Sequence, residues 1–233
     1  MPLFSYHVIE APAHRVALRL IASGKLKKVP GLLHSERMLR MRMGAPVLAP
    51  RRYRFGSLIF IGLWETEASL DQFLESPPYP IFTRPSYHLR LRAYRRWGTY
   101  RGFDQASVPT EADSAPSGRV VGLTVARLRL SQTLRFARWG RPVEAQVRDH
   151  PGMLHGAVSF RPFNTFSTFS VWENEEAMLG MVRGRAERDG SEHRKAMIER
   201  AKRPFHHEFI TLRLEPLSEH GAWPDARRLL PAP

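Results

Sequence analysis

The sequence contains no cysteine among its 233 residues. This absence excludes disulfide bonds, thiolate catalysis, iron–sulfur ligation and cysteine-based zinc sites. Apolar runs are short: the longest, residues 57–64, has the length of one strand, whereas a membrane-spanning helix needs roughly 20 apolar residues. The N-terminus has no cationic start followed by a long apolar stretch. We therefore expect no signal peptide, no transmembrane segment and, by default, a cytoplasmic location.

Several familiar catalytic motifs are missing as well. The sequence has neither Gly-x-Gly-x-x-Gly nor Gly-x-x-x-x-Gly-Lys, so it does not favour a dinucleotide-binding or phosphate-loop enzyme. It also lacks the Gly-x-Ser-x-Gly elbow of the α/β-hydrolases. The acidic pairs Glu65/Glu67 and Glu173/Glu175 stand at expected helix starts, where the helix dipole explains them without catalysis.

Negative charge is scarce relative to positive charge. Lysine and arginine number 36 against 22 aspartates and glutamates, which gives a net charge of +14. Such a balance attracts polyanions and anionic membrane surfaces. The arginines are spread along the chain, however, and no nucleic-acid motif frames them. We interpret them as a solvated surface, which disfavours nucleic-acid binding and leaves peripheral membrane contact open.

The chain contains an internal repeat. The segment Val-Pro-Gly-Leu-Leu-His at 29–34 precedes Phe-Ile-Gly-Leu-Trp-Glu at 60–65, and His-Pro-Gly-Met-Leu-His at 150–155 precedes Phe-Ser-Val-Trp-Glu at 169–173. The interval is longer in the first copy, and its extra residues fall in 42–56, a Pro-, Gly- and Arg-rich stretch that indicates a loop.

Each copy shows the order strand, helix, strand, strand, helix, strand, which is typical of the ferredoxin-like α+β unit. The pattern is clearest in the second copy. There we expect a strand at 120–130, a helix at 132–147, hairpin strands at 156–160 and 165–172, a helix capped by Asn174, and a closing strand at 207–214.

We therefore divide the chain into a first repeat (1–103), a linker (104–118) that lacks periodicity, a second repeat (119–223) and a C-terminal tail (224–233). Each repeat has one exposed sheet face, and the two faces should bury each other. The predicted fold is thus a pair of tandem ferredoxin-like repeats forming a single-chain dimeric α/β-barrel. Because one chain supplies both halves, either a monomer or a homodimer is compatible with it.

Histidines are the candidate ligands. His34 and His155 occupy matched repeat positions and are more simply structural, while His206 and His207 start a strand on which one side chain points in and the other out. A metal pair there would need a third ligand, which the sequence does not place.

His193 begins a probable helix at 191–202, with Met197 near the same face and Arg200 two turns further on. A buried anion such as a haem propionate would explain His193 and Arg200 together. A structural histidine and an arginine that reaches solvent explain them as well.

The second copy resembles the spheroidene monooxygenase family, the acyclic carotenoid 2-ketolases of purple bacteria. The segments that carry the resemblance are Thr-Phe-Ser-Val-Trp at 168–172, Glu-Ala-Met at 176–178, His-Arg-Lys-Ala-Met-Ile at 193–198, Glu-Phe-Ile-Thr-Leu-Arg-Leu at 208–214 and Gly-Ala-Trp at 221–223. The first copy is similar mainly at 62–65 and 70–73. The resemblance thus covers nearly the whole chain and is most specific in the last third.

The resemblance implies a member of the dimeric α/β-barrel superfamily that binds haem and inserts a keto oxygen into a long apolar polyene, with electrons from a ferredoxin-type donor. It makes His193 the candidate axial ligand of the haem iron, because His193 stands in the family's His-x-x-Ala-Ile stretch. Arg200 would bind the cofactor. The residues expected to line the substrate pocket are Phe166, Phe169, Trp172 and Met197.

Two functions from different classes follow. The first is a haem-dependent monooxygenase-like protein that acts on an apolar substrate held between the two repeats. The second is a non-catalytic or cofactor-free barrel that binds a small hydrophobic molecule or a protein partner. The first requires a histidine that projects into an apolar cavity large enough for a porphyrin, with cations nearby for its propionates. The second needs only a small or closed cavity.

Overall fold

The structure is a computed structural model that describes residues 2–21, 29–75, 87–106, 108, 116–183, 192–224 and 228–230. Its strands are β1 (Leu3–Glu10), β2 (Leu32–Met41), β3 (Tyr53–Trp64), β4 (Tyr87–Thr99), β5 (Val120–Leu128), β6 (Met153–Arg161), β7 (Thr165–Trp172) and β8 (His206–His220). Its α-helices are α1 (Ala13–Ile21), α2 (Glu67–Glu75), α3 (Thr133–Arg148), α4 (Glu175–Arg183) and α5 (Glu192–Lys202).

The elements expected in the second copy are present. The strand expected at 120–130 is β5, and the helix expected at 132–147 is α3. Asn174 caps α4, because its Oδ1 accepts a hydrogen bond of 2.8 Å from the backbone N–H of Ala177. The expected start of α5 at Ser191 lies outside the described residues, and the helix is described from Glu192 onward.

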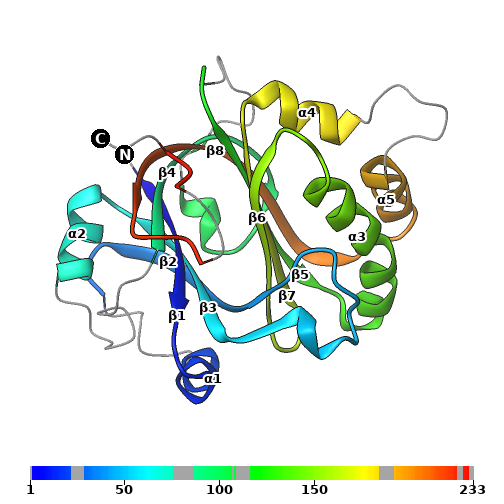
Figure 1. The fold of residues 1–233 in the computed structure, drawn as a ribbon, viewed down its shortest axis with the longest axis horizontal. Coiled ribbons are helices and arrows are strands. Elements are labelled where there is room, and N and C mark those ends of the chain that lie inside the picture. Colours follow the sequence, from blue (N-terminus) through cyan, green and yellow to red (C-terminus); the bar gives the residue numbers. More distant parts are fainter. Residues whose placement is uncertain are drawn as a thin grey trace.

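The strands form a closed barrel in the order β1-β3-β2-β6-β7-β5-β8-β4. In each copy the first and third strands are central and the second and fourth lie at the edges, which is the order of a ferredoxin-like sheet. Figure 1 shows α1 and α2 on one side of the barrel and α3, α4 and α5 on the other. The predicted fold, two ferredoxin-like repeats joined in a single-chain α/β-barrel, is confirmed.

The two copies meet along two antiparallel seams. The short seam joins β2 to β6 around the pair Leu39 and Phe160, and the long seam joins β4 to β8 from His88 opposite His220 to Thr99 opposite Phe209. Among the described strands, closure leaves no unpaired edge and so removes a common route to aggregation.

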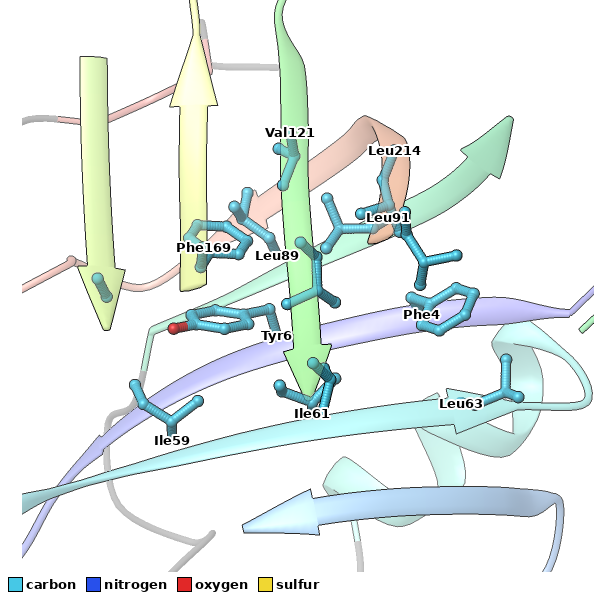
Figure 2. Packing of buried hydrophobic residues seen from close by; sticks show 14 of the residues in the cluster. Phe4, Tyr6, Ile59, Ile61, Leu63, Leu89, Leu91, Val121, Phe169 and Leu214 are labelled. Atoms are coloured by element: carbon cyan, nitrogen blue, oxygen red, sulfur yellow. The ribbon is translucent and has the colours of Figure 1, made fainter. Parts of the chain in front are cut away.

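Side chains fill the interior of the barrel. Strand residues alternate between the two faces of the sheet, and the inward set of both copies forms one apolar cluster. Figure 2 shows Tyr6 and Phe169 beside each other in this cluster, with ring centroids 3.8 Å apart and the rings stacked. Tyr6 comes from the first copy and Phe169 from the second, so the contact joins the two repeats.

Two short segments, each following the last strand of its copy, complete this core. We call them the first plug (Tyr100, Phe103, Ala106 and Val108) and the second plug (Trp223, Leu229 and Leu230). The Phe103 ring lies 4.7 Å from the ring of His34, and the Trp223 ring lies 3.9 Å from the ring of His155. The matched histidines therefore each pack against a plug, which accounts for their repetition without a ligand.

The division of the chain at 104, 118 and 223 stays a prediction, and residues 107 and 109–115 of the expected linker lie outside the described ranges. The described residues of the expected linker and tail include several that are buried. Ala106 is 2% exposed, Val108 is 8% exposed and Leu229 is 5% exposed. In the described part of the chain, no helix has the length and apolar character needed to cross a membrane.

Candidate functional site

A cavity of about 250 Å³ lies on the outer side of the second copy, between the sheet face of β5, β7 and β8 and the helices α3, α4 and α5. This position corrects the expectation that a ligand would be held between the two repeats. The space between the repeats is filled by the core and its plugs, whereas the helices of the second copy leave a gap above their own sheet.

Three registered rows of side chains form the floor of the cavity. The pairing of β7, β5 and β8 sets residues of the three strands side by side. The rows are Phe166, Ala126 and Phe209; then Thr168, Thr124 and Thr211; then Ser170 and Gly122. The floor thus changes from aromatic to hydroxyl-bearing along its length.

Helix α3 forms an apolar wall. Phe136, Gly140, Val143 and Val147 line the cavity at intervals of three or four residues, which puts them on one helix face, and Trp139 beside Gly140 lines it as well. Met178, Met181 and Val182 of α4 line it as well. Because nearly all of these side chains are apolar, the cavity suits an apolar ligand.

The same face of the first copy is packed differently. Phe60, Trp64 and Phe73 pack together there in one buried cluster, with the Trp64 and Phe73 ring centroids 5.0 Å apart. Trp64 matches Trp172, and the indole N–H of each donates to a serine hydroxyl, that of Ser5 and Ser170 respectively. The repeated tryptophan is thus a shared structural feature, and the cavity distinguishes the second copy.

His193 stands in the α5 wall of the cavity. Its backbone N–H donates a hydrogen bond of 3.1 Å to Oε1 of Gln146 on α3, which fixes the start of α5 against that helix. Burial lowers the pKa of the imidazole below its ordinary value. A neutral imidazole retains a lone pair on one ring nitrogen, and this neutral form is the one that binds a metal ion.

Arg200 lines the same cavity two turns further along α5. Its guanidinium lies over the Phe209 ring, 3.9 Å from the centroid, and burial lowers its pKa. Among the described residues no carboxylate pairs with it. Because arginine keeps its charge in proteins, an anionic group of a ligand in the cavity would find a counter-charge here.

His206, at the start of β8, is a second imidazole in the cavity wall. Aromatic rings surround it, with the Phe209 centroid at 5.1 Å and the Phe136 centroid at 5.8 Å. Burial, helped by the charge of Arg200, lowers its pKa to about 4. The next residue, His207, is exposed, so the two side chains point to opposite sides as strand geometry requires.

Acidification is expected to destabilise the fold partly through His206. Its pKa is about 4 in the folded protein against an ordinary value of 6.5, so between these pH values the unfolded chain takes up a proton that the folded protein does not. The contribution of the neutral ring is complete above pH 6.5 and is lost as the pH falls toward 4. When the pH is lowered from 6.5 to 4, the free energy of unfolding measured with urea should fall less for His206→Phe than for the unmodified chain. If the free energy of unfolding of His206→Phe fell as much as that of the exposed-site variant His207→Phe, this assignment would be contradicted.

The structure brings most of the predicted site residues together. His193, Arg200, Phe166, Trp172 and Met197 all line the cavity. Phe169 does not, and this expectation is corrected. Positions 166 and 172 of β7 share the outward face with 168 and 170, whereas 169 points inward and stacks on Tyr6 in the barrel core.

Sequence reasoning missed the part of the site that comes from the first copy. The insertion at 42–56 was predicted as a loop, but its residues 53–56 belong to β3. The part before β3 reaches α3, and Met43 and Glu144 line the cavity there. Arg52 forms a bidentate ion pair with Glu144, with N–O distances of 2.7 and 3.0 Å, and the backbone N–H of Gly44 donates to the same carboxylate. The insertion thus contributes to the cavity lining and is held to α3 by a buried ion pair.

A closed metal site is not seen in the part of the chain that the structure describes, since no three histidine, aspartate or glutamate side chains group there in a metal-binding arrangement. A cofactor that brings its own ligands needs only one protein ligand, and a porphyrin is of this kind. The residues present fit that requirement: His193 supplies a neutral imidazole, Arg200 a cation, and the surrounding walls are apolar.

Fold and site together define an α/β-barrel of two ferredoxin-like copies that carries an apolar, histidine-bearing cavity in its second copy. No family model matches the chain. It is similar to the spheroidene monooxygenase of Rubrivivax gelatinosus, with 29% identity over 182 residues, which are 77% of this chain and 67% of the relative. The resemblance read from the motifs is thereby confirmed: the chain is similar in sequence to a spheroidene monooxygenase.

A solved structure supports the fold. An aldoxime dehydratase, OxdRE, in complex with butyraldoxime superposes with a TM-score of 0.59 at 10% identity, covering 95% of this chain and 83% of its own. An anthrone oxidase-like protein is more distant, with a TM-score of 0.37 at 13% identity, covering 98% and 97%. At 10% identity the likeness to the dehydratase concerns the architecture alone.

Proposed function

We propose that this protein is a haem-dependent monooxygenase that oxidises an apolar, carotenoid-like substrate. The observation that carries the proposal is the convergence of His193 and Arg200 on one apolar cavity. The similarity to spheroidene monooxygenase supplies the reaction class. When bound, haem would supply the activation of dioxygen, with one oxygen atom entering the substrate and the other leaving as water at the expense of two electrons from an external, ferredoxin-type donor.

The protein's own contribution is binding and orientation. His193 would hold the iron through its neutral ring, and the bond from its backbone N–H to Gln146 keeps the start of α5 in place. Arg200 would bind a carboxylate of the cofactor, because the cavity is apolar and offers this guanidinium without a carboxylate partner among the described residues.

The apolar walls would orient the substrate and exclude water. Phe166, Trp172 and Met197 offer apolar surface to a hydrocarbon chain, and Met43 of the insertion loop adds to this lining. His206 is neutral near pH 7 because its pKa is about 4, so it would add no charge near the substrate. An apolar polyene suits such a site because it needs no polar partners of its own.

An absorption spectrum of protein expressed with haem supplied tests the proposal. We expect a Soret band from the unmodified chain, a lost or strongly shifted band from His193→Ala, and a band from the exposed-site control His207→Ala that matches the unmodified chain. Replacement of Arg200 by glutamine should weaken haem binding about tenfold, as expected for one hydrogen bond to a charged group.

A colourless unmodified protein under haem-replete conditions would overturn the haem proposal. The apolar lining of the cavity supports one other function, the binding of a small hydrophobic ligand without a cofactor. In that event a fluorescent apolar probe should still bind, and its affinity should fall when the cavity is filled by Ala126→Trp but not when His193 is replaced.

A further inference from the structure

The cavity floor contains a row of three hydroxyl groups that the proposed function leaves unused. Thr124 of β5 lies opposite Thr168 of β7 on one side and opposite Thr211 of β8 on the other. All three side chains line the cavity. We call this set the threonine row.

The threonine row has more hydroxyl hydrogens than its hydrogen bonds use. The hydroxyls of Thr124 and Thr211 lie 3.1 Å apart, so one donates to the other. Three hydroxyl groups carry three hydrogens, and this bond uses one of them. Among the described residues no acceptor takes the other two. By contrast, the neighbouring Ser170 hydroxyl accepts the indole N–H of Trp172 at 2.9 Å and has a carbonyl, that of Gly122, at 3.5 Å.

His193 lines the same cavity as the threonine row, from the helix wall formed by α5, whereas the row lies in the sheet floor. The guanidinium of Arg200, also on α5, lies over the ring of Phe209, which precedes Thr211 by two residues on the same face of β8. The row and the α5 wall therefore border one cavity.

We propose that the threonine row is the binding site for a small oxygen ligand, dioxygen in the reaction, held by hydrogen bonds at the floor of the cavity that His193 also lines. This inference rests on the proposed function. Its physical reason is that hydroxyl donors in an otherwise apolar cavity strengthen the binding of a ligand that accepts hydrogen bonds and hardly affect one that does not. A floor built only for a hydrocarbon would gain nothing from three threonines.

Two probes of opposite character test the assignment on haem-loaded protein. Cyanide accepts hydrogen bonds well when bound to ferric haem, and carbon monoxide on ferrous haem accepts them poorly. For Thr124→Val/Thr211→Val and for Thr168→Val we expect a cyanide dissociation constant raised about tenfold, the size of one good hydrogen bond. Carbon monoxide affinity should change less than twofold, and its stretching frequency should rise.

Controls separate hydrogen bonding from shape. Valine has the branched shape of threonine, and an unchanged Soret band verifies that the haem site remains formed. Serine at the same positions retains the hydroxyl and should restore cyanide affinity, whereas Thr133→Val, at an exposed site at the start of α3, should change nothing.

The outcomes distinguish this inference from the proposed function. If the unmodified chain binds no haem, both fall together. If haem binds through His193 but the valine variants bind cyanide as tightly as the Thr133→Val control, the threonine row is part of the floor only, and the proposed function stands without it.

Discussion

Replacement of Arg52 by leucine is expected to lower the free energy of unfolding by about 3–5 kcal/mol, because it leaves a buried carboxylate without its partner. The side chains of Arg52 and Glu144 are 4% and 8% exposed, and their ion pair joins the insertion loop of the first copy to α3 of the second. In the variant only the N–H of Gly44 would still donate to Glu144. The loss can be measured by urea unfolding, and Arg51→Leu, at the exposed neighbouring position, is the matched control.

The double variant Arg52→Leu/Glu144→Leu sharpens this test. Removing both charges removes the unpaired carboxylate, so most of the lost stability should return. Equal stability of Arg52→Leu and Arg51→Leu would show that the pair has no such role. Because Glu144 and Met43 line the cavity, we also expect Arg52→Leu to weaken the binding of an apolar ligand even under conditions where the protein stays folded.

Truncation of Trp223 to alanine is expected to cost about 3–5 kcal/mol, the range for a large buried aromatic side chain. Trp223 is 3% exposed and contacts both copies: its ring lies 4.8 Å from Tyr87 of the first copy and 3.9 Å from His155 of the second. Loss of the ring would open a void inside the barrel that the closed sheet cannot collapse to fill.

Urea unfolding of Trp223→Ala beside Trp223→Phe measures this effect, with the smaller change expected to cost clearly less. The cavity lies on the other side of the sheet, so the folded alanine variant should retain the ligand-binding behaviour of the unmodified chain. A stability loss below about 1 kcal/mol would mean that the second plug does not belong to the cooperative core.

The barrel could be predicted from the sequence because the same motifs occur in both halves of the chain. The Pro-Gly turn and the Trp-Glu ending occur once in each half, so each copy supported the interpretation of the other. The closed strand order then follows from two sheets that each need a partner for their apolar face. Local patterns sufficed here because strands and helices are specified by residues close together in the chain.

The site was only partly predictable, for a physical reason. His193, Arg200 and Met197 share one helix face, which spacing reveals. Phe169 was misplaced because an odd spacing along a strand crosses to the other face, and the alternation of β7 could have shown this. The ion pair of Arg52 and Glu144 joins residues far apart in the chain, so no local sequence pattern predicts it.

The cavity itself depends on what the helices leave unfilled. Phe60 and Phe73 close the first copy, whereas Ala126 and Gly122 occupy floor positions in the second and leave room above the sheet. The threonine row is equally invisible in the sequence, because Thr124, Thr168 and Thr211 become neighbours only through the register of three strands.

The two plugs bear on the order in which the protein is made. The first plug follows β4 and can seat only against its own copy while the second is still being synthesised, so the inward face of the first sheet stays exposed on the ribosome. Trp223 lies beyond β8, and the interior becomes complete only after it has left the exit tunnel. Nascent chains halted before Trp223 should therefore be the ones that chaperones hold longest.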